Sequence, residues 1–165
     1  LGTYVYGIDS ENIEQRVVEL LKANKLTLAT AESCTGGMIA ARLTSVSGAS
    51  GAFKYGAVTY CNEAKHLVLG VSTETLDEHG AISEKTAREM AEGIRKVMNA
   101  DIGVSVTGNA GPGAAENKPV GLVYMGVASE KGVRALKFNF TGDRDRVRIL
   151  ASGNALSLAL NEIKE

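Results

Sequence analysis

Three side chains that could act as nucleophiles or hold an anion lie together at one point of the chain. Ser33, Cys34 and Thr35 follow the apolar stretch 26–31 and precede a glycine pair that opens a helical pattern. A strand that ends at the start of a helix presents such side chains at the positive end of the helix dipole. The pattern is therefore typical of a turn that presents a nucleophile or binds an anion.

Ser33 is the candidate nucleophile of this turn. Backbone N–H groups near Gly36 and Gly37 would then stabilise the oxyanion that forms when serine attacks a carbonyl. An ordinary helix start capped by Ser or Thr is the alternative. Cys34 is a rival nucleophile, although a cysteine beside an apolar strand is more typical of a small buried side chain.

Lys65 is the candidate base for this serine. It lies beyond the end of the apolar stretch 55–60, and desolvation can lower the pKa of a lysine enough for the amine to accept a proton. A solvated lysine is the alternative. Tyr60 could relay a proton or order the lysine, or be a core tyrosine. His66 lies inside a helical run and His79 before a turn glycine, so neither has the setting of a base.

Two other polar stretches could hold a ligand. The glycine-rich loop 108–113 lacks both the Walker sequence and the spacing of a dinucleotide-binding loop, so it either lets the backbone approach a small ligand or simply turns the chain. Arg144 and Arg146 open the last helical run, where they suit a carboxylate, a phosphate or solvent. No carboxylate pair or metal-ligand cluster has a telling spacing, and we expect no metal and no cofactor.

Helices and strands alternate around these stretches. The 3.6-residue apolar period predicts helices and short β-branched runs predict strands. The predicted helices are 13–21 with a cap at Asp9 or Ser10, 38–46, 62–69, 73–79, 84–98 and 144–164, and the predicted strands are 26–31, 55–60, 101–107, 120–128 and 133–140. This order predicts a three-layer α/β/α domain whose largely parallel sheet becomes mixed through a late hairpin at 129–132.

The predicted sheet brings the polar stretches together. Ligands bind beyond the carboxyl ends of the strands in such sheets. The loops after Ala31, Tyr60 and Thr107 should therefore converge on one crevice, and the helix start at Arg144 could join them.

Composition limits the classes of function. A chain of 165 residues with 44% hydrophobic residues suits one domain with a real core. The 18 Lys and Arg and 19 Asp and Glu are mixed along the chain, which argues against nucleic acid as a partner. With no apolar run near the roughly 20 residues of a membrane helix, we expect no membrane partner and a cytoplasmic location. Cys34 and Cys61 are expected to be reduced.

Four motifs together resemble the CinA C-terminal domain family, the nicotinamide mononucleotide amidohydrolases or deamidases. They are ESCTGG at 32–37, VTYCNEAK at 58–65, VTGNAGPG followed by KPVG within 106–121, and GDRDRVR at 142–148. The resemblance covers residues 10–165 and implies a mixed five-stranded sheet. It also implies hydrolysis of the carboxamide of nicotinamide mononucleotide to nicotinate mononucleotide and ammonia, in pyridine nucleotide recycling.

The resemblance also carries expectations about partners. It implies a homo-oligomer, with a dimer favoured, and in longer family members a covalently linked N-terminal domain of molybdopterin-binding type. Residues 1–9 would then be a linker or junction remnant. Cys61, Asn109 and Ala114 depart from the family's pattern.

By the same resemblance, Ser33 attacks the carboxamide carbon, Lys65 exchanges the protons, and Tyr60 assists. Water then cleaves the acyl-enzyme. The small-molecule nucleotide substrate would be held by a further set of residues. These are Thr35, Gly36, Gly37, Thr107, Gly108, Ala110, Gly111 and Arg144.

Two rival functions stay open at this point. One is a non-catalytic nucleotide-binding or regulatory domain of a competence or damage-inducible protein, which would use the same turns to hold phosphate. The other is a hydrolase that depends on Cys34 in place of Ser33.

Overall fold

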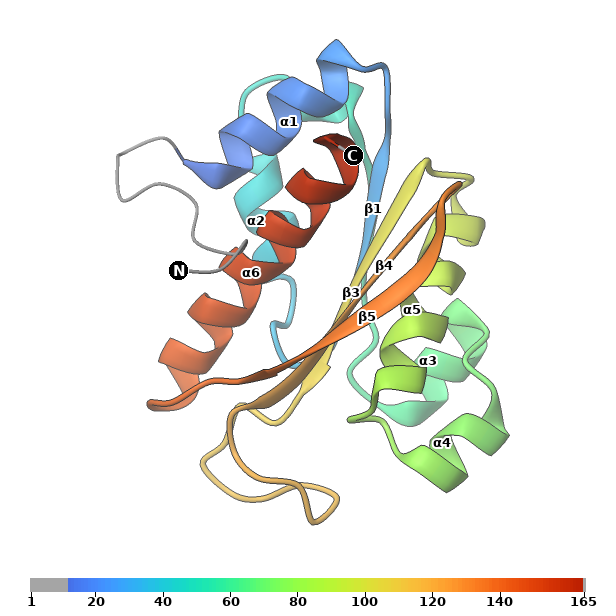
Figure 1. Ribbon diagram of the computed structural model, residues 1–165, viewed down its shortest axis with the longest axis vertical. Coiled ribbons are helices and arrows are strands. Elements are labelled where there is room, and N and C mark those ends of the chain that lie inside the picture. Colours follow the sequence, from blue (N-terminus) through green and yellow to red (C-terminus); the bar gives the residue numbers. More distant parts are fainter. Residues whose placement is uncertain (1–11, 165) are drawn as a thin grey trace.

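The computed structural model describes residues 12–164, which form three layers (Figure 1). A five-stranded sheet separates one group of three helices, α1, α2 and α6, from another, α3, α4 and α5. The helices are α1 (Ile13–Ala23), α2 (Met38–Thr44), α3 (Asn62–Leu69), α4 (Thr73–His79), α5 (Glu84–Val97) and α6 (Arg144–Lys164), with a 3-10 turn η1 (Ala49–Gly51). The strands are β1 (Leu28–Glu32), β2 (Phe53–Val58), β3 (Ile102–Gly108), β4 (Leu122–Ser129) and β5 (Gly132–Asn139).

The sheet has the strand order β2-β1-β3-β4-β5. Strand β1 pairs in parallel with both β2 and β3, whereas β4 pairs antiparallel with both β3 and β5. All strands except β4 therefore run in one direction. The predicted three-layer domain with a mixed, mostly parallel five-stranded sheet is confirmed. The hairpin also lies where it was predicted, with Ser129 paired to Gly132.

Among the strand boundaries that differ from the prediction by one or two residues, two have clear local reasons. Strand β1 begins at Leu28 and not at Leu26, because the Leu26 amide is still bonded to the Leu21 carbonyl at the end of α1. Strand β2 ends at Val58. The Thr59 amide makes a last bond to the Glu32 carbonyl, and the chain then turns into α3.

The described part of helix α1 begins at Ile13, after Asn12 at the N-cap position. The predicted caps Asp9 and Ser10, and the predicted linker 1–9, lie outside the described residues.

Helix α5 packs unusually close to the sheet, and glycines make this possible. A Cβ at Gly103 of β3 would lie 2.2 Å from the Ala91 carbonyl oxygen, and one at Gly126 of β4 would lie 2.3 Å from that of Ala87. Within α5, a Cβ at Gly93 would lie 1.9 Å from the carbonyl oxygen of Leu69 at the end of α3. Close packing thus holds α3 firmly against α5 and the sheet.

The other face of the sheet carries the larger apolar core. Buried side chains of β1, β3 and β4 pack there against α1, α2 and α6. The core includes Leu28, Val104 and Met125 from the sheet and Leu21 and Leu158 from the helices, all at most 1% exposed.

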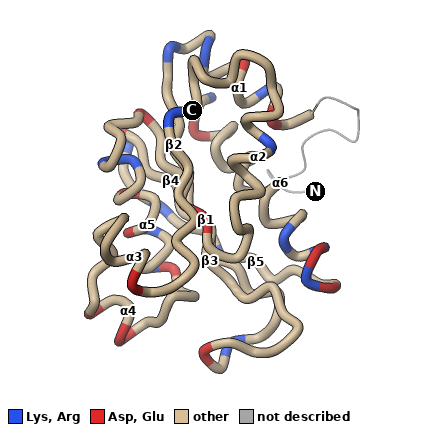
Figure 2. Tube along the Cα trace, turned by 180° about the vertical axis from the view of Figure 1, so that it is seen from behind, with Lys and Arg blue, Asp and Glu red and all other residues tan. Residues whose placement is uncertain are grey.

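Charged residues of both signs are spread along the chain (Figure 2). Among residues 12–164, no helix has both the length and the apolar character needed to cross a lipid bilayer.

Candidate active site

Ser33 and Lys65 meet at the carboxyl ends of β1 and β2. Ser33 follows β1, Lys65 lies in α3, and the two residues are 32 positions apart in the chain. The Lys65 Nζ is 3.1 Å from the Ser33 Oγ and donates a 2.8 Å hydrogen bond to the Thr59 carbonyl. Lys65 is 1% exposed and Ser33 8%. The fold thus brings a hydroxyl and an amine into hydrogen-bond distance away from bulk water.

Burial governs the charge of this amine. Burial lowers the pKa of Lys65, and the opposing effects of Cys61, Cys34 and Glu116 are smaller. No carboxylate within residues 12–164 forms an ion pair with the Lys65 amine that would hold its proton in place. A desolvated lysine of lowered pKa favours the neutral amine, which can accept a proton from a neighbouring hydroxyl. The pair therefore has the composition of a nucleophile and its base.

Glu32 shapes the turn that presents Ser33. Its carboxylate is 1% exposed and accepts hydrogen bonds from the amides of Gly37 at 3.1 Å, Ile39 at 3.0 Å and Ala40 at 2.9 Å. These amides would otherwise be unpaired donors at the start of α2. The chain reaches the helix through Gly37 in a left-handed conformation with φ +97°, which glycine adopts without strain. The carboxylate therefore occupies the N-terminus of α2.

This arrangement corrects the expected role of the glycine pair. The Gly37 amide donates to Glu32, and the Gly36 amide donates to the Ser33 carbonyl at 3.0 Å. Neither amide is available to an oxyanion. A glutamate directly before the turn was the signal for this cap, because carboxylates are favoured at helix N-termini.

A cavity of about 350 Å³ opens onto the Ser33–Lys65 pair. It lies at the crevice predicted from the strand ends. The candidate residues that line it are Ser33, Tyr60, Lys65, Thr107, Gly108, Ala110, Gly111 and Arg144. Three other candidates, Thr35, Gly36 and Gly37, lie outside its lining. The walls also contain residues that the sequence did not single out as ligand-binding, namely Asn62, Ala81, Ile82, Ala115 and Glu116.

Tyr60 and Arg144 form one side of the cavity. The Arg144 guanidinium donates to the Gly111 carbonyl at 2.6 Å and to the Tyr60 hydroxyl at 2.9 Å. Tyr60 is 60% exposed, and its hydroxyl bonds to Arg144. The Thr59 carbonyl, and not the Tyr60 hydroxyl, orders the lysine. The tyrosine therefore positions the arginine in this structure.

The glycine-rich loop is fixed largely by its own neighbours. Thr107, 1% exposed, donates its hydroxyl to the Ala81 carbonyl at 2.7 Å. The Asn109 side chain accepts from the Gly111 amide at 2.9 Å and donates to the Lys118 carbonyl at 3.2 Å. Asn109, which was expected to depart from the family's pattern, thus holds the loop in shape.

Thr35 is fully buried, and its hydroxyl has no hydrogen-bond partner among the described residues. Its backbone carbonyl accepts a 3.2 Å hydrogen bond from Arg148 of α6. Thr35 thus helps to hold the turn that follows Ser33 against α6.

Cys34 and the two histidines are poorly suited to replace Ser33 and Lys65. Burial raises the pKa of the Cys34 thiol to about 11, which disfavours the reactive thiolate. Both cysteines are free, Cys34 buried and Cys61 exposed. His66 Nδ1 lies 2.8 Å from the Val71 carbonyl oxygen, and neither His66 nor His79 lines the cavity.

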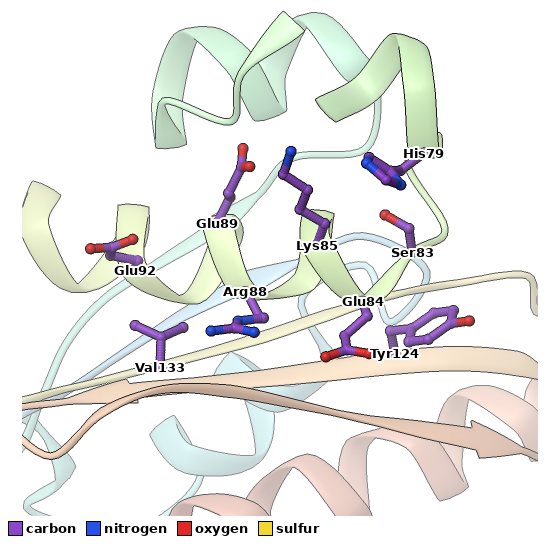
Figure 3. A pocket seen from close by; sticks show the side chains of 9 residues that line it. All are labelled: His79, Ser83, Glu84, Lys85, Arg88, Glu89, Glu92, Tyr124 and Val133. Atoms are coloured by element: carbon purple, nitrogen blue, oxygen red, sulfur yellow. The ribbon is translucent and has the colours of Figure 1, made fainter. Parts of the chain in front are cut away.

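A larger hollow of about 880 Å³ lies around α5 next to β4 and β5 (Figure 3). Two of its polar side chains, Ser83 and Glu89, have structural roles. Ser83 caps α5 through the Thr86 amide at 3.1 Å, and the Glu89 carboxylate accepts from the Ser72 amide and the Thr75 hydroxyl. This hollow contains no pair comparable to Ser33 and Lys65 among the described residues.

Comparison with known proteins places this chain in a family. The model of the CinA C-terminal domain matches residues 10–163. The chain belongs to the CinA C-terminal domain family. A CinA-like protein of Geobacter sp. strain M21 is 50% identical over 158 residues, which are 95% of this chain and 38% of that protein. The chain therefore spans about two fifths of the length of that curated relative.

Solved structures agree with this family assignment. A CinA superfamily protein from Klebsiella pneumoniae 700603 has a TM-score of 0.90 and 34% identity, covering 94% of this chain and 99% of its own. The competence/damage inducible protein CihA from Agrobacterium tumefaciens has a TM-score of 0.87 and 37% identity, covering 97% and 100%. The arrangement of helices and strands is thus that of the CinA superfamily.

Proposed function

We propose that this CinA domain hydrolyses the carboxamide of nicotinamide mononucleotide to nicotinate mononucleotide and ammonia. The observation that carries the proposal is the buried contact of 3.1 Å between the Ser33 Oγ and the Lys65 Nζ. Serine with a desolvated lysine is a known arrangement for acyl transfer. The four motifs that resemble those of the nicotinamide mononucleotide amidohydrolases support this carboxamide as the substrate.

The reaction follows from the positions of the two side chains. Ser33 Oγ attacks the carboxamide carbon while the neutral Lys65 amine takes the hydroxyl proton. The tetrahedral intermediate collapses, the C–N bond breaks, and Lys65 returns that proton to the nitrogen, which leaves as ammonia. Water then adds to the acyl-enzyme, giving its proton to Lys65, and the ester bond to Ser33 breaks. Lys65 reprotonates the serine, so both side chains end as they began.

The oxyanion needs donors other than Gly36 and Gly37. The amides of Cys34 and Ala110 are suitable, because both residues line the cavity and neither amide donates to another residue within residues 12–164. The amide that follows the nucleophile and one from a neighbouring loop form the oxyanion hole in other serine hydrolases. We assign these two amides to that role.

The remainder of the substrate would lie toward the mouth of the cavity. Arg144 opens α6, and its guanidinium suits a phosphate. Residues 107–111 form the wall of the cavity next to that cation. The exposed Tyr60 ring lies beside the same arginine.

Ammonia release from nicotinamide mononucleotide tests the proposal. The unmodified domain should release ammonia with multiple turnovers, and Ser33→Ala should lower kcat by roughly 10⁴-fold or more. Cys34→Ala should stay within about tenfold of the unmodified domain, because the thiol takes no part in the chemistry. Ser157→Ala is the matched control, since this serine is also buried but lies within α6 outside the cavity.

Two results would contradict the proposal. Binding of the nucleotide without release of ammonia would favour a regulatory domain. Loss of activity in Cys34→Ala together with its retention in Ser33→Ala would favour a cysteine hydrolase.

A further inference from the structure

Glu116 places a fixed carboxylate in the wall of the cavity that holds Ser33 and Lys65. Its Oε1 accepts from the Ala81 amide at 2.9 Å and its Oε2 from the Ile82 amide at 3.0 Å. Gly80 leaves room for the group, since a Cβ there would lie 2.4 Å from Oε2. The Glu116 side chain is 32% exposed. The negative charge is thus held at one place, although it lies on a loop.

A nearby lysine does not remove this charge from the cavity. Lys118 Nζ lies 3.7 Å from the Glu116 Oε2, but the same amine donates to the carbonyls of His79 and Ile82. Lys118 is not part of the cavity lining. A ligand in the cavity would therefore contact Glu116 and not Lys118.

The cavity carries two opposite charges on different walls. Arg144 at the start of α6 provides the positive charge and Glu116 the negative one. Lys65 also lines the cavity, and burial lowers the pKa of its amine. The influence of Glu116 also reaches the reacting amine, where it weakly raises the Lys65 pKa against that larger effect. Such a cavity is complementary to a ligand with a cationic part and an anionic part.

We infer that Glu116 is a specificity-determining residue that makes the site prefer a cationic aromatic carboxamide over a neutral one of the same shape. The inference rests on the proposed function. An N-ribosylated pyridinium ring carries a full positive charge, and the attached phosphate would pair with Arg144. Attraction between the ring and a partly buried carboxylate is screened less than at an open surface.

The ring keeps its charge throughout the attack on the carboxamide. The attraction to Glu116 is therefore nearly equal in the bound substrate and the transition state, so its loss should appear in KM more than in kcat. A residue that only held the loop in shape would affect cationic and neutral compounds equally.

The test compares two carboxamides that differ in ring charge. One is nicotinamide mononucleotide. The other is the 5′-phosphate of a benzamide C-riboside, in which a carbon replaces the ring nitrogen and the ring is neutral. In Glu116→Gln, the ratio of kcat/KM for the cationic compound to that for the neutral compound should fall about tenfold, mainly through KM.

Two variants separate charge from loop structure. Glu116→Asp keeps the charge and should retain the preference within about threefold. Lys118→Met removes two hydrogen bonds that tie the loop to residues 79–82, together with the cation 3.7 Å from the carboxylate, so it should not lower the preference for the cationic compound. Equal losses for both compounds in Glu116→Gln would overturn the inference.

The inference can be tested even if the proposed function fails. If the unmodified domain releases no ammonia, calorimetric dissociation constants for the two compounds replace the kinetic ratio. A preference for the cationic compound that falls about tenfold in Glu116→Gln supports the inference. Equal affinities in the unmodified domain overturn it.

Discussion

The two ends of strands β1 and β3 use polar side chains in opposite ways. At the amino end, the amide and the hydroxyl of Thr27 both donate to the Asp101 carboxylate at 2.7 Å, and the Asp101 amide donates back at 3.1 Å. At the carboxyl end, the buried amine of Lys65 faces a hydroxyl and a carbonyl instead of a carboxylate. One end holds its carboxylate with hydrogen-bond donors for stability, while the other buries an amine without a counter-charge.

The difference shows where this domain gives up stability for chemistry. An unpaired buried amine disfavours its charged form, which is the property that a base requires. A carboxylate close to Lys65 would have stabilised its ammonium form and removed that property. Stability and reactivity are thus separated along the same two strands.

Removing the buried amine should have the largest effect. We expect Lys65→Met to lower kcat/KM by about 10³-fold or more, because the base is lost. The free energy of unfolding at pH 7 should change by only about 1 kcal/mol, whereas loss of one member of a buried ion pair costs about 3–5 kcal/mol. Ammonia release and urea unfolding measure the two quantities.

Lys96→Met is the matched control, because this lysine is 71% exposed and pairs with Glu92 on the surface of α5. The stability of the unmodified domain relative to Lys65→Met should increase as the pH rises from the lowered folded pKa toward the ordinary lysine value. In that window only the unfolded chain carries the extra proton. The free energy by which this proton stabilises the unfolded chain decreases as the pH rises. A loss of several kcal/mol in Lys65→Met would show that the amine is paired and charged.

Activity should fall by about tenfold for each pH unit on the acid side of its pH profile. Burial lowers the pKa of Lys65, and the reaction needs the neutral amine. Activity is therefore lost as the pH falls through the lowered pKa and levels above it. Measurement of kcat/KM against pH gives the inflection. An inflection at the ordinary lysine value would show that the site does not desolvate the amine.

The cap on α2 should have the next largest effect. Glu32→Gln replaces an acceptor of three backbone bonds with a group that turns an NH₂ toward one of the donors. We expect a loss of about 2–3 kcal/mol in the free energy of unfolding, measured in urea. Activity should also fall, because Ser33 is the next residue. Glu92→Gln is the control for an exposed carboxylate. An equal loss of unfolding free energy in Glu92→Gln would show that the cap formed by Glu32 adds no stability of its own.

The amino-end clamp should have the smallest effect. Asp101→Asn should cost about 0.5–1 kcal/mol at neutral pH, since the group is largely exposed and its bonds compete with water. Activity should not change. The bond from the Thr27 side chain lowers the pKa of Asp101, so the stabilisation is present above the ordinary carboxyl value and is lost as the pH falls through the lowered one. Urea unfolding at low pH should therefore find the two proteins equally stable.

Local patterns were sufficient to predict the layers of this domain. The apolar period of α5 and the β-branched runs of β3 and β4 depend on which face of each element is buried, and this information is present in a short window of sequence. The hairpin at Ser129 to Gly132 followed from a short loop between two such runs. The same rules placed polar stretches at the carboxyl ends of parallel strands, so a crevice there was predictable.

Tertiary packing alone decided how the polar groups within that crevice are paired. The amides at Gly36 and Gly37 were expected to be free, but the Gly37 amide donates to Glu32 and the Gly36 amide to the Ser33 carbonyl. The lysine is ordered by the Thr59 carbonyl and not by Tyr60. Glu116 reaches the cavity from a loop that carried no recognisable ligand-binding signal. A hydrogen-bond partner depends on distances of a few tenths of an ångström between segments far apart in the chain. Sequence periodicity determined which elements form and which of their ends face the crevice, whereas the packing of α3 against α5 and β1 determined that an amine and a hydroxyl 32 residues apart lie within reach of each other.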